Sequence, residues 1–397
     1  MADLKIFTDN IEEKAREQID ILMKQPAFAE CKVRIMPDVH AGAGCVIGFT
    51  ADLGDKVIPN IVGVDLGCGM NTVKIAEKNI DFEKLDKVIR QYIPSGRNTH
   101  AGKKVSFDKL NDLHCYRELK DMKRIIRSIG TLGGGNHFIE IDKDDEGNYY
   151  LIIHSGSRNL GKQVAEYYQN LAVEIMQGKG EVLEKQAKLI VDYKAQGRRK
   201  EIQAAIKELY KKYRPNPLNI PKELCYLTGE YREQYLHDMK ICQEYAVLNR
   251  ATMADIIIEH MGWTMVESFE TIHNYIEYDS NMVRKGAISA KLNEKLLIPI
   301  NMRDGCILGI GKGADDWNQS APHGAGRLMS RTQARKEVNL NEYQESMRDI
   351  FTTSVGLETI DEAPMAYKPM EEIINNIGET VEILKILKPV YNFKAGE

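Results

Sequence analysis

The chain has 397 residues, of which 43% are hydrophobic, 28% charged and only 7% aromatic, a composition typical of a globular protein. Its 54 basic and 58 acidic side chains give a net charge of −4, which excludes a basic packaging protein and an acidic tail but allows a local basic face. No apolar run approaches the roughly 18 residues of a membrane span, and the acidic start does not resemble a signal peptide. We therefore expect a soluble, cytoplasmic protein without membrane contacts.

The seven cysteines do not form the pattern of a disulfide framework. Their number is odd, they lie far apart, and no Cys-x-x-Cys pair occurs. We expect most of them to be reduced thiols that fill the core as small hydrophobic side chains.

The first third of the chain is predicted to pass from a helix to strands and back to helices. Apolar residues recur at helical spacing up to Met23, and this helix should end near Pro26. Residues 31–75 contain short apolar runs between Gly- and Pro-containing turns, which is typical of strands. Residues 77–129 are polar, and we interpret them as mostly helical.

The rest of the chain shows no regular alternation of strand and helix. Its middle is rich in Glu, Lys, Gln, Ala and Leu, which favours long helices. The predicted elements are two strands around a turn at 145–148, long helices over 161–260 broken at 215–217, strands at 270–278 and 286–310, a Gly-rich loop at 309–326 and a helix at 327–338.

This order of elements bears on the fold class. Strands that do not alternate one for one with helices argue against a doubly wound parallel sheet. We predict an α+β fold, with one large domain over residues 1–397 and a helical excursion at about 161–260.

Five segments combine small residues with side chains that can bind a metal or a phosphate. Glycine lets the backbone adopt positive φ and approach a ligand closely, and such loops on rigid strands commonly carry function. The five segments are Met36–Gly44, Gly63–Gly69, Gly133–His137, His154–Arg158 and His323–Arg327.

Three of these segments, together with His273, suggest a metal site. Asp65 and Cys68 lie three residues apart in one glycine turn, so both side chains can converge on one point. With His137, His154 and His273 they form a set larger than one tetrahedral site uses. Such ligands suit Zn²⁺, Mn²⁺ or Fe²⁺, and ligand type alone does not choose among them. Taken singly, a buried cysteine is more often part of the core, and a strand histidine is more often only hydrogen-bonded.

Two glycine runs share some features of phosphate-binding loops. Gly133–Gly135 could hold a phosphate with backbone N–H groups, but it is not a Walker A loop because no Gly-Lys-Ser/Thr follows. Gly309–Gly313 fails the same test, and we interpret it as a tight turn or an exposed loop.

His323 is the most distinctive histidine because small residues clear space around it. If a helix begins near residue 325, Arg327 and Arg331 share one of its faces and its N-terminus points toward the histidine. A neutral imidazole can attack phosphorus, and nearby arginines would stabilise the phosphate oxygens. The alternative is a histidine that only hydrogen-bonds within a turn.

Basic residues gather in the predicted helices of the middle region. A basic helical face could bind RNA phosphates without sequence preference. Interleaved Glu201 and Glu208 favour an ordinary solvated helix instead. The basic residues are Arg198, Arg199, Lys200, Lys207, Lys211, Lys212 and Arg214.

Nine segments, in order from about residue 31 to the end of the chain, resemble the RtcB-type RNA-splicing ligase family. Nine collinear motifs are far more specific than any single spacing. They are MPDVH at 36–40, VDLGCGM at 64–70, GTLGGGNHFIE at 130–140, HSGSR at 154–158, HNY at 273–275, RKGA at 284–287, HGAGRLMSR at 323–331, DEAPMAYK at 361–368 and Lys394.

The resemblance implies a fold with mixed strands around a deep metal and nucleotide pocket. It also implies an enzyme that joins a 2′,3′-cyclic phosphate or 3′-phosphate RNA end to a 5′-hydroxyl RNA end, using GTP and two Mn²⁺ ions. In the implied route, His323 attacks the α-phosphorus of GTP and becomes a covalent histidine–GMP. The 3′-phosphate takes over the GMP as an RNA-ppG end, and the 5′-hydroxyl then displaces GMP.

Carried over by motif, the resemblance implies two manganese sites that share Cys68. Asp65 and His137 would complete the first site, and His154 and His273 the second. The implied contacts to RNA phosphates are Arg158 and Arg331, and the implied nucleotide contacts are Asn136, Glu140, Asn301, Cys306, Ala325, Arg327, Tyr367 and Lys394.

One segment departs from the family pattern, which reads Pro-Gly-Ser-Met-Gly-x-x-Ser. Residues 299–306 read Pro-Ile-Asn-Met-Arg-Asp-Gly-Cys, so Asn301 and Cys306 replace both serines. Glu140 suits the N–H donors of guanine and Asn301 can still hydrogen-bond, so nucleotide use is expected while strict GTP preference stays open. Asp38 and His40 belong to a family motif for which the sequence provides no role.

Three functional hypotheses follow. The leading one is the RNA ligase, acting in tRNA splicing or, as a divergent member, in RNA repair. The altered segment motivates a second, a metal-dependent RNA-end phosphohydrolase or cyclic phosphodiesterase that lacks nucleotide transfer. The third is a non-enzymatic RNA-binding or partner-docking protein that uses the helices at 161–260.

Overall fold

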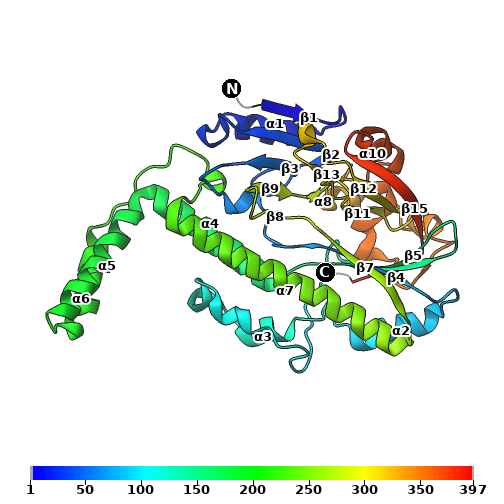
Figure 1. Ribbon diagram of the computed structural model, residues 1–397, viewed down its shortest axis with the longest axis horizontal. Coiled ribbons are helices and arrows are strands. Elements are labelled where there is room, and N and C mark those ends of the chain that lie inside the picture. The colour runs from blue at the N-terminus through cyan, green and yellow to red at the C-terminus, as the bar shows by residue number, and fades with distance from the viewer. Residues whose placement is uncertain (1–2, 396–397) are drawn as a thin grey trace.

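The computed structural model describes residues 3–395 and combines three β-sheets with flanking helices (Figure 1). Within these residues, all but two of the strand pairings are antiparallel. This confirms the mixed α/β organisation predicted from the sequence.

The largest sheet surrounds the candidate site. It comprises β4 (Gly69–Ile75), β5 (Phe138–Lys143), β6 (Tyr149–Ser155), β7 (Met265–Ile272), β11 (Lys295–Asn301), β12 (Gly305–Gly311), β14 (Phe351–Thr352) and β15 (Val381–Lys394). The order across the sheet is β11–β12–β15–β5–β6–β4–β7, with β14 beside β15. Every residue of β6 is buried, as expected of a strand rich in Tyr, Leu and Ile that has neighbours on both sides.

Two smaller sheets complete the β-structure. The five-stranded one contains β1 (Asp3–Ile6), β2 (Lys32–His40), β3 (Ile47–Asp52), β8 (Tyr275–Ile276) and β9 (Met282–Lys285), and the two-stranded one pairs β10 (Ala287–Ser289) with β13 (Ser320–Pro322). The order of the former is β1–β2–β3–β9–β8. The sequence did not predict β1, and the motif at 36–40, interpreted as a turn, is instead the buried end of β2.

Helices flank these sheets, and the longest fall between β6 and β7 in the chain. They are α1 (Glu13–Met23), α2 (Phe82–Tyr92), α3 (Met122–Arg127), α4 (Arg158–Glu174), α5 (Gly180–Ala195), α6 (Ile202–Lys212), α7 (Gly229–Met261), α8 (Arg331–Glu337), α9 (Leu340–Ser346) and α10 (Met370–Ile377). Residues 77–129, which were predicted to be mostly helical, form α-helix only in α2 and α3. Between them Pro94 and Gly96, which has a φ of 61°, interrupt the helix, and only short 3₁₀ turns follow.

The 33-residue helix α7 packs against β4, β6, α2 and α4 and crosses the molecule in Figure 1. One core cluster lies between this helix and the sheet, where Ile257 is buried with Val73, Ile139, Leu151 and Ile153. Among residues 3–395, no helix has both the length and the apolar character needed to cross a membrane.

Strand register brings four loops together at one edge of the largest sheet. In antiparallel strands, the start of one lies beside the end of its neighbour. Gly69 at the start of β4 pairs with Ser155 at the end of β6 and with Ile272 at the end of β7. Phe138 at the start of β5 pairs with His154 near the end of β6. The loops before β4 and β5 therefore meet the loops after β6 and β7.

The interpretation of Gly309–Gly313 as a turn or exposed loop is wrong for its first three residues, while Lys312 and Gly313 lie beyond the strand. Gly309 and Gly311 belong to β12, beside the long strand β15 that the sequence did not predict. A Cβ atom at Gly309 would lie 2.6 Å from the Val381 side chain, and one at Gly311 would lie 2.3 Å from the Ala290 backbone. Glycine is therefore required here by close packing within the sheet.

Candidate active site

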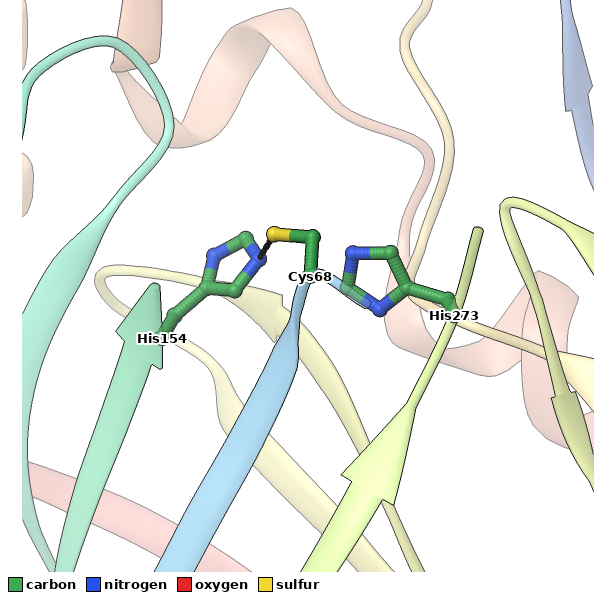
Figure 2. Close-up of side chains that lie close together, drawn as sticks. All are labelled: Cys68, His154 and His273. Atoms are coloured by element: carbon green, nitrogen blue, oxygen red, sulfur yellow. Dashed lines mark hydrogen bonds between the residues drawn. The ribbon is translucent and has the colours of Figure 1, made fainter. Parts of the chain in front are cut away.

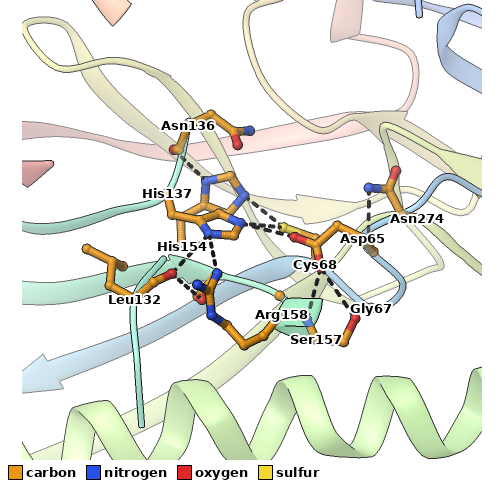
Figure 3. Close-up of polar contacts among 12 residues, drawn as sticks. Asp65, Gly67, Cys68, Leu132, Asn136, His137, His154, Ser157, Arg158 and Asn274 are labelled. Carbon is orange, nitrogen blue, oxygen red and sulfur yellow. Dashed lines mark hydrogen bonds and ion pairs between the residues drawn. The ribbon is translucent and has the colours of Figure 1, made fainter. Parts of the chain in front are cut away.

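The structure brings together all five residues proposed as metal ligands (Figures 2 and 3). Cys68 Sγ lies 3.3 Å from His154 Nε2 and 3.5 Å from His137 Nε2, and the latter atom lies 3.1 Å from Asp65 Oδ2. Two groups share Cys68, one with Asp65 and His137 and the other with His154 and His273, and in each the potential ligand atoms lie within 4.8 Å of one another. The geometry can hold two metal ions on either side of one sulfur.

The second ring nitrogen of two imidazoles is fixed by backbone oxygens. His137 Nδ1 lies 3.0 Å from the Leu132 oxygen, and His154 Nδ1 lies 3.1 Å from the Asn136 oxygen (Figure 3). In the neutral His154 ring, donation from Nδ1 leaves Nε2 unprotonated and facing Cys68. Metal-binding histidines are commonly oriented in this way.

The electrostatics of this cluster fit a cation. Burial, reinforced by neighbouring imidazoles, lowers the pKa values of His154 and His273, so both rings are neutral. Burial and the nearby Asp65 carboxylate raise the pKa of the Cys68 thiol, which a bound cation would deprotonate. Within residues 3–395, the buried His273 Nδ1 has no hydrogen-bond partner, a costly state that a ligand would relieve.

Two glycines make room for charged side chains at this cluster. A Cβ atom at Gly156 would lie 2.2 Å from Asp65 Oδ1, and one at Gly133 would lie 1.8 Å from Arg158 Nη1. Arg158 itself has a φ of 56°, a conformation that non-glycine residues seldom adopt. The glycine run at 133–135 therefore admits the Arg158 guanidinium.

Two side chains of α7 hold these loops in place, and the sequence analysis did not identify them. Asn249 Oδ1 accepts the Thr131 N–H (3.0 Å), and its Nδ2 donates to Ser155 Oγ (3.1 Å). The buried Arg250 donates to the backbone oxygens of Gly67 (2.9 Å) and Ser155 (2.6 Å). A polar pair inside a long helix thus fixes the loops that carry the ligand-type residues.

His323 is held by Asp38, which provides the role that the sequence did not. Asp38 is fully buried, and its Oδ2 lies 2.6 Å from His323 Nδ1 while accepting the backbone N–H groups of His323 (3.1 Å) and Gly324 (3.3 Å). Nδ1 therefore donates to the Asp38 carboxylate, and Nε2 is the ring nitrogen that Asp38 does not engage. The His323 ring centroid lies 4.8 Å from that of His273, so this ring borders the metal-type cluster.

His40, the other motif residue without a predicted role, lines the same region. Its Nδ1 lies 2.9 Å from the Asp38 backbone oxygen. Removal from water lowers the pKa of His40 to about 4, so the ring is neutral at physiological pH.

A cavity of about 500 Å³ joins His323 to most of the residues implied to bind the nucleotide. This volume lies in the usual range for a small-molecule site. Of the residues that the sequence proposed, those lining it are Asn136, Glu140, His154, Asn301, His323, Ala325, Arg327, Arg331, Tyr367 and Lys394.

Glu362 holds the basic side chains of this cavity in place. It lies in one of the quoted motifs, but the sequence analysis assigned it no role. Its carboxylate forms ion pairs with Lys394 (2.6 Å), Arg331 (3.0 Å) and Arg327 (3.2 Å) and accepts the Tyr367 hydroxyl (2.6 Å). Burial alone would raise the pKa of Glu362, but these cations lower it to about 2. One buried anion thus arranges four groups that can meet phosphate and base.

A second buried cluster lies around Glu140, which also lines the cavity. Glu140 accepts the Asn392 amide, and its Oε1 lies 3.9 Å from Cys306 Sγ. Asp142 is fully buried, and neither of its oxygens meets a hydrogen-bond donor from residues 3–395. Burial and the Glu140 carboxylate raise the pKa of Asp142 well above its ordinary value, which favours the protonated form of Asp142 beside Glu140.

The predicted shared helix face of Arg327 and Arg331 is wrong. α8 begins at Arg331, and Ser330 Oγ caps it by accepting the Gln333 N–H (3.2 Å), so Arg327 lies in the preceding loop. The two guanidinium groups nevertheless converge, because both pair with Glu362.

Three further residues with an implied binding role do not present a free side chain to the cavity. Arg158 lines a separate cleft beside Asp65. Cys306 lies behind Glu140 and is not among the residues that line the cavity. Asn301 lines the cavity, but its amide is engaged in a turn, where Nδ2 donates to Asp304 Oδ2 (2.8 Å).

Comparison with known proteins agrees with this geometry. The family model described as tRNA-splicing ligase RtcB matches residues 18–120 and 114–395. Two Escherichia coli proteins described as RNA-splicing ligases are each 29% identical over 431 residues, covering 98% of this chain and 96% of theirs. A tRNA-splicing ligase of Nanoarchaeum equitans is 25% identical over 462 residues, covering 91% of this chain and 86% of its own. The chain therefore belongs to the RtcB family of RNA-splicing ligases and is an RNA ligase.

Proposed function

We propose that this RNA ligase joins 2′,3′-cyclic phosphate or 3′-phosphate RNA ends to 5′-hydroxyl RNA ends, with GTP as the activating nucleotide and two Mn²⁺ ions as cofactors. The observation that carries the proposal is the position of His323. Its Nδ1 is held by Asp38, its ring borders the Cys68 cluster, and it opens into the cavity lined by the implied nucleotide contacts.

The first step is nucleotidyl transfer to the protein. His323 Nε2 attacks the α-phosphorus of GTP, a P–N bond forms, and the bond to the leaving pyrophosphate breaks. Asp38 stabilises the positive charge that develops on the imidazole, as a carboxylate partner of a catalytic histidine does. Arg327 and Lys394 are the cations of the cavity that would meet the phosphates.

The next steps transfer the GMP and join the strands. A cyclic phosphate is first opened to a 3′-phosphate, which attacks the guanylylated histidine to give an RNA-ppG end and free His323. The 5′-hydroxyl of the second strand then attacks the activated phosphorus, and GMP leaves. This route gives a terminal phosphate the leaving group that it lacks.

The metal ions would be held by the two groups that share Cys68. Asp65 and His137 would complete one site, and His154 and His273 the other. When bound, the ions would neutralise charge on the phosphates and on the Cys68 thiolate. The orphaned His273 Nδ1 and the neutral imidazoles support this assignment.

Glu140 is the proposed reader of the base. A carboxylate that accepts two N–H donors suits the edge of guanine and not that of adenine. Asn392 donates to this carboxylate and holds it in place, although Asn301 and Cys306 replace the serines of the family pattern.

The physiological role is proposed to be tRNA splicing or the repair of cleaved RNA. The relatives are described as ligases of spliced RNA or tRNA, so the non-enzymatic hypothesis is set aside. The phosphohydrolase hypothesis keeps one observation in its favour, since the Asn301 amide is committed to a turn and not to the cavity.

The test is covalent labelling with α-labelled GTP and Mn²⁺. Wild type should give a labelled, acid-labile protein adduct, and His323→Ala should give none. His114→Ala is the matched control, because His114 is an exposed histidine outside the cavity, and it should label fully. Equal labelling of His323→Ala would overturn the nucleophile assignment. Release of 3′-phosphate ends without adduct or joined product would favour the phosphohydrolase.

A further inference from the structure

A helical arm, residues 175–217, extends away from the rest of the molecule at the end of α4. It contains α5 and α6, and Figure 1 shows the pair turned away from the sheets at the far end from β15. Gly178, with a φ of 92°, marks the bend between α4 and α5. The bend sends the chain outward instead of back onto the core.

The helical arm contributes little to the core. Val182 is the single buried residue of α5, and α6 has none. The two helices are tied to each other, for example by the Tyr210 hydroxyl donating to Gln186 Oε1 (2.8 Å). Because so little apolar surface is buried, the stability of the fold does not explain this excursion.

The charge of the helical arm is opposite to that of the body. Residues 175–217 carry eleven Lys and Arg against five Asp and Glu, a net charge of +6. Since the whole chain carries −4, all other residues together carry −10. RNA is a polyanion, so the acidic body of an RNA ligase repels its substrate, whereas the positive charge of the arm attracts it.

Most of these cations are free to bind another molecule. Acidic partners engage Lys179, Lys185, Arg198 and Lys211. The other basic side chains of the arm are exposed, and none forms an ion pair with a residue of the described range 3–395. They are Lys188, Lys194, Arg199, Lys200, Lys207, Lys212 and Arg214.

A second basic cluster lies at the opposite end of α4. The cleft beside Asp65 is lined by Arg97, Arg124, Arg158 and Lys162, and the last two lie within the first five residues of α4. The 17 residues of α4 span about 25 Å, so this helix links the cleft at the metal-type cluster to the base of the arm.

We propose that the helical arm binds the phosphate backbone of the RNA substrate at a distance from the ends being joined. This inference rests on the proposed function. An RNA that leaves the cleft beside Asp65 and follows α4 outward meets the unpaired cations of the arm. Contacts of Lys and Arg to phosphates position the RNA without reading its sequence.

The test compares two triple variants with wild type. Arg199→Glu/Lys200→Glu/Lys207→Glu reverses three unpaired cations of the arm. Lys24→Glu/Lys87→Glu/Lys388→Glu reverses three exposed lysines that line none of the cavities described above. Affinity is measured by salt titration on an RNA duplex of roughly 16 base pairs with a 3′-phosphate overhang.

The arm variant should bind this RNA about tenfold more weakly than wild type, and its slope of log affinity against log salt should be smaller by roughly 2–3. The control variant should match wild type. Joining of oligonucleotides too short to follow α4 should be unchanged in both, and so should labelling by GTP, which needs no RNA.

Two results would overturn the inference. One is arm-variant binding and salt dependence equal to wild type on the long RNA, which would leave the arm to a protein partner. The other is an equal loss on long and short substrates. Failure of wild type to label with GTP would instead contradict the proposed function, so the two failures are distinguishable.

Discussion

The cluster at Cys68 and the cluster at Cys306 both combine a thiol with carboxyl groups, but only the former contains imidazoles. Each places a buried thiol beside at least one carboxyl group, and in each the potential ligand atoms are close enough together for a metal ion. Three imidazoles surround Cys68, whereas the ligand-type side chains grouped with Cys306 are Glu140 and Asp142, which lie two residues apart on β5.

Under the proposed function, this difference separates a site for a cation from a site for a proton. Around Cys68, neutral imidazoles offer lone pairs and the His273 Nδ1 has no partner within the described residues. Around Cys306, burial raises the pKa values of both carboxyl groups, and sharing a proton removes one negative charge. Residue types alone would have marked both clusters as metal sites.

The largest expected effect comes from removing the shared sulfur. Cys68→Ala should reduce bound Mn²⁺ from two ions per chain to none and lower joining by more than the 10–100-fold typical of an outer-shell change. Metal analysis after gel filtration measures the first effect. Cys306→Ala is the matched buried thiol, and if it lost manganese equally, the distinction between the clusters would fail.

A smaller effect is expected from the proton of Asp142. Its pKa is raised in the folded protein, so the folded state binds a proton more tightly than the unfolded state, and stability falls as pH rises above the ordinary pKa of an aspartate. Asp142→Asn removes this dependence while keeping the shape and a donor.

Thermal unfolding from pH 5 to pH 8 measures this prediction. The melting temperature of Asp142→Asn relative to wild type should rise with pH, by about 2–4 °C, the shift that ~1 kcal/mol produces in a large domain. A difference that stays constant with pH would show that Asp142 is ionised in the folded protein.

The smallest effect is expected from Cys306 itself. Its Sγ lies 3.9 Å from Glu140 Oε1, a weak contact, and a serine hydroxyl can donate a stronger hydrogen bond to that oxygen. Cys306→Ser should therefore raise the preference for GTP over ATP in adduct formation by about two- to fivefold. Cys31→Ser, a cysteine remote from Glu140, should leave the ratio unchanged, and a lowered ratio in Cys306→Ser would contradict the account.

The ligand-type residues were predictable because glycine-rich loops can be recognised from a short stretch of sequence. Asp65 and Cys68 share one turn, and the strands around the turn at 145–148 are those observed as β5 and β6. Their convergence also needed the pairing of β4 with β6 and β7, which joins segments far apart in the chain and leaves no local signal.

The supporting residues were not predictable for the same reason. Asp38 and His323 lie 285 positions apart, and only the fold makes one the partner of the other. Glu362 was visible in a motif that also contains Tyr367, but its three cationic partners, Arg327, Arg331 and Lys394, lie on other segments. Asn249 and Arg250 lie inside α7, where polar and apolar residues are mixed, so nothing in the local sequence distinguishes them from other polar helix residues.

The most direct measurement is anomalous diffraction from crystals of the protein soaked with Mn²⁺ and GTP. The account predicts two manganese peaks on either side of Cys68 Sγ, one with Asp65 and His137 and one with His154 and His273, and no peak between Glu140 and Cys306. A single peak away from Cys68, or manganese between the two carboxyl groups at Cys306, would contradict it.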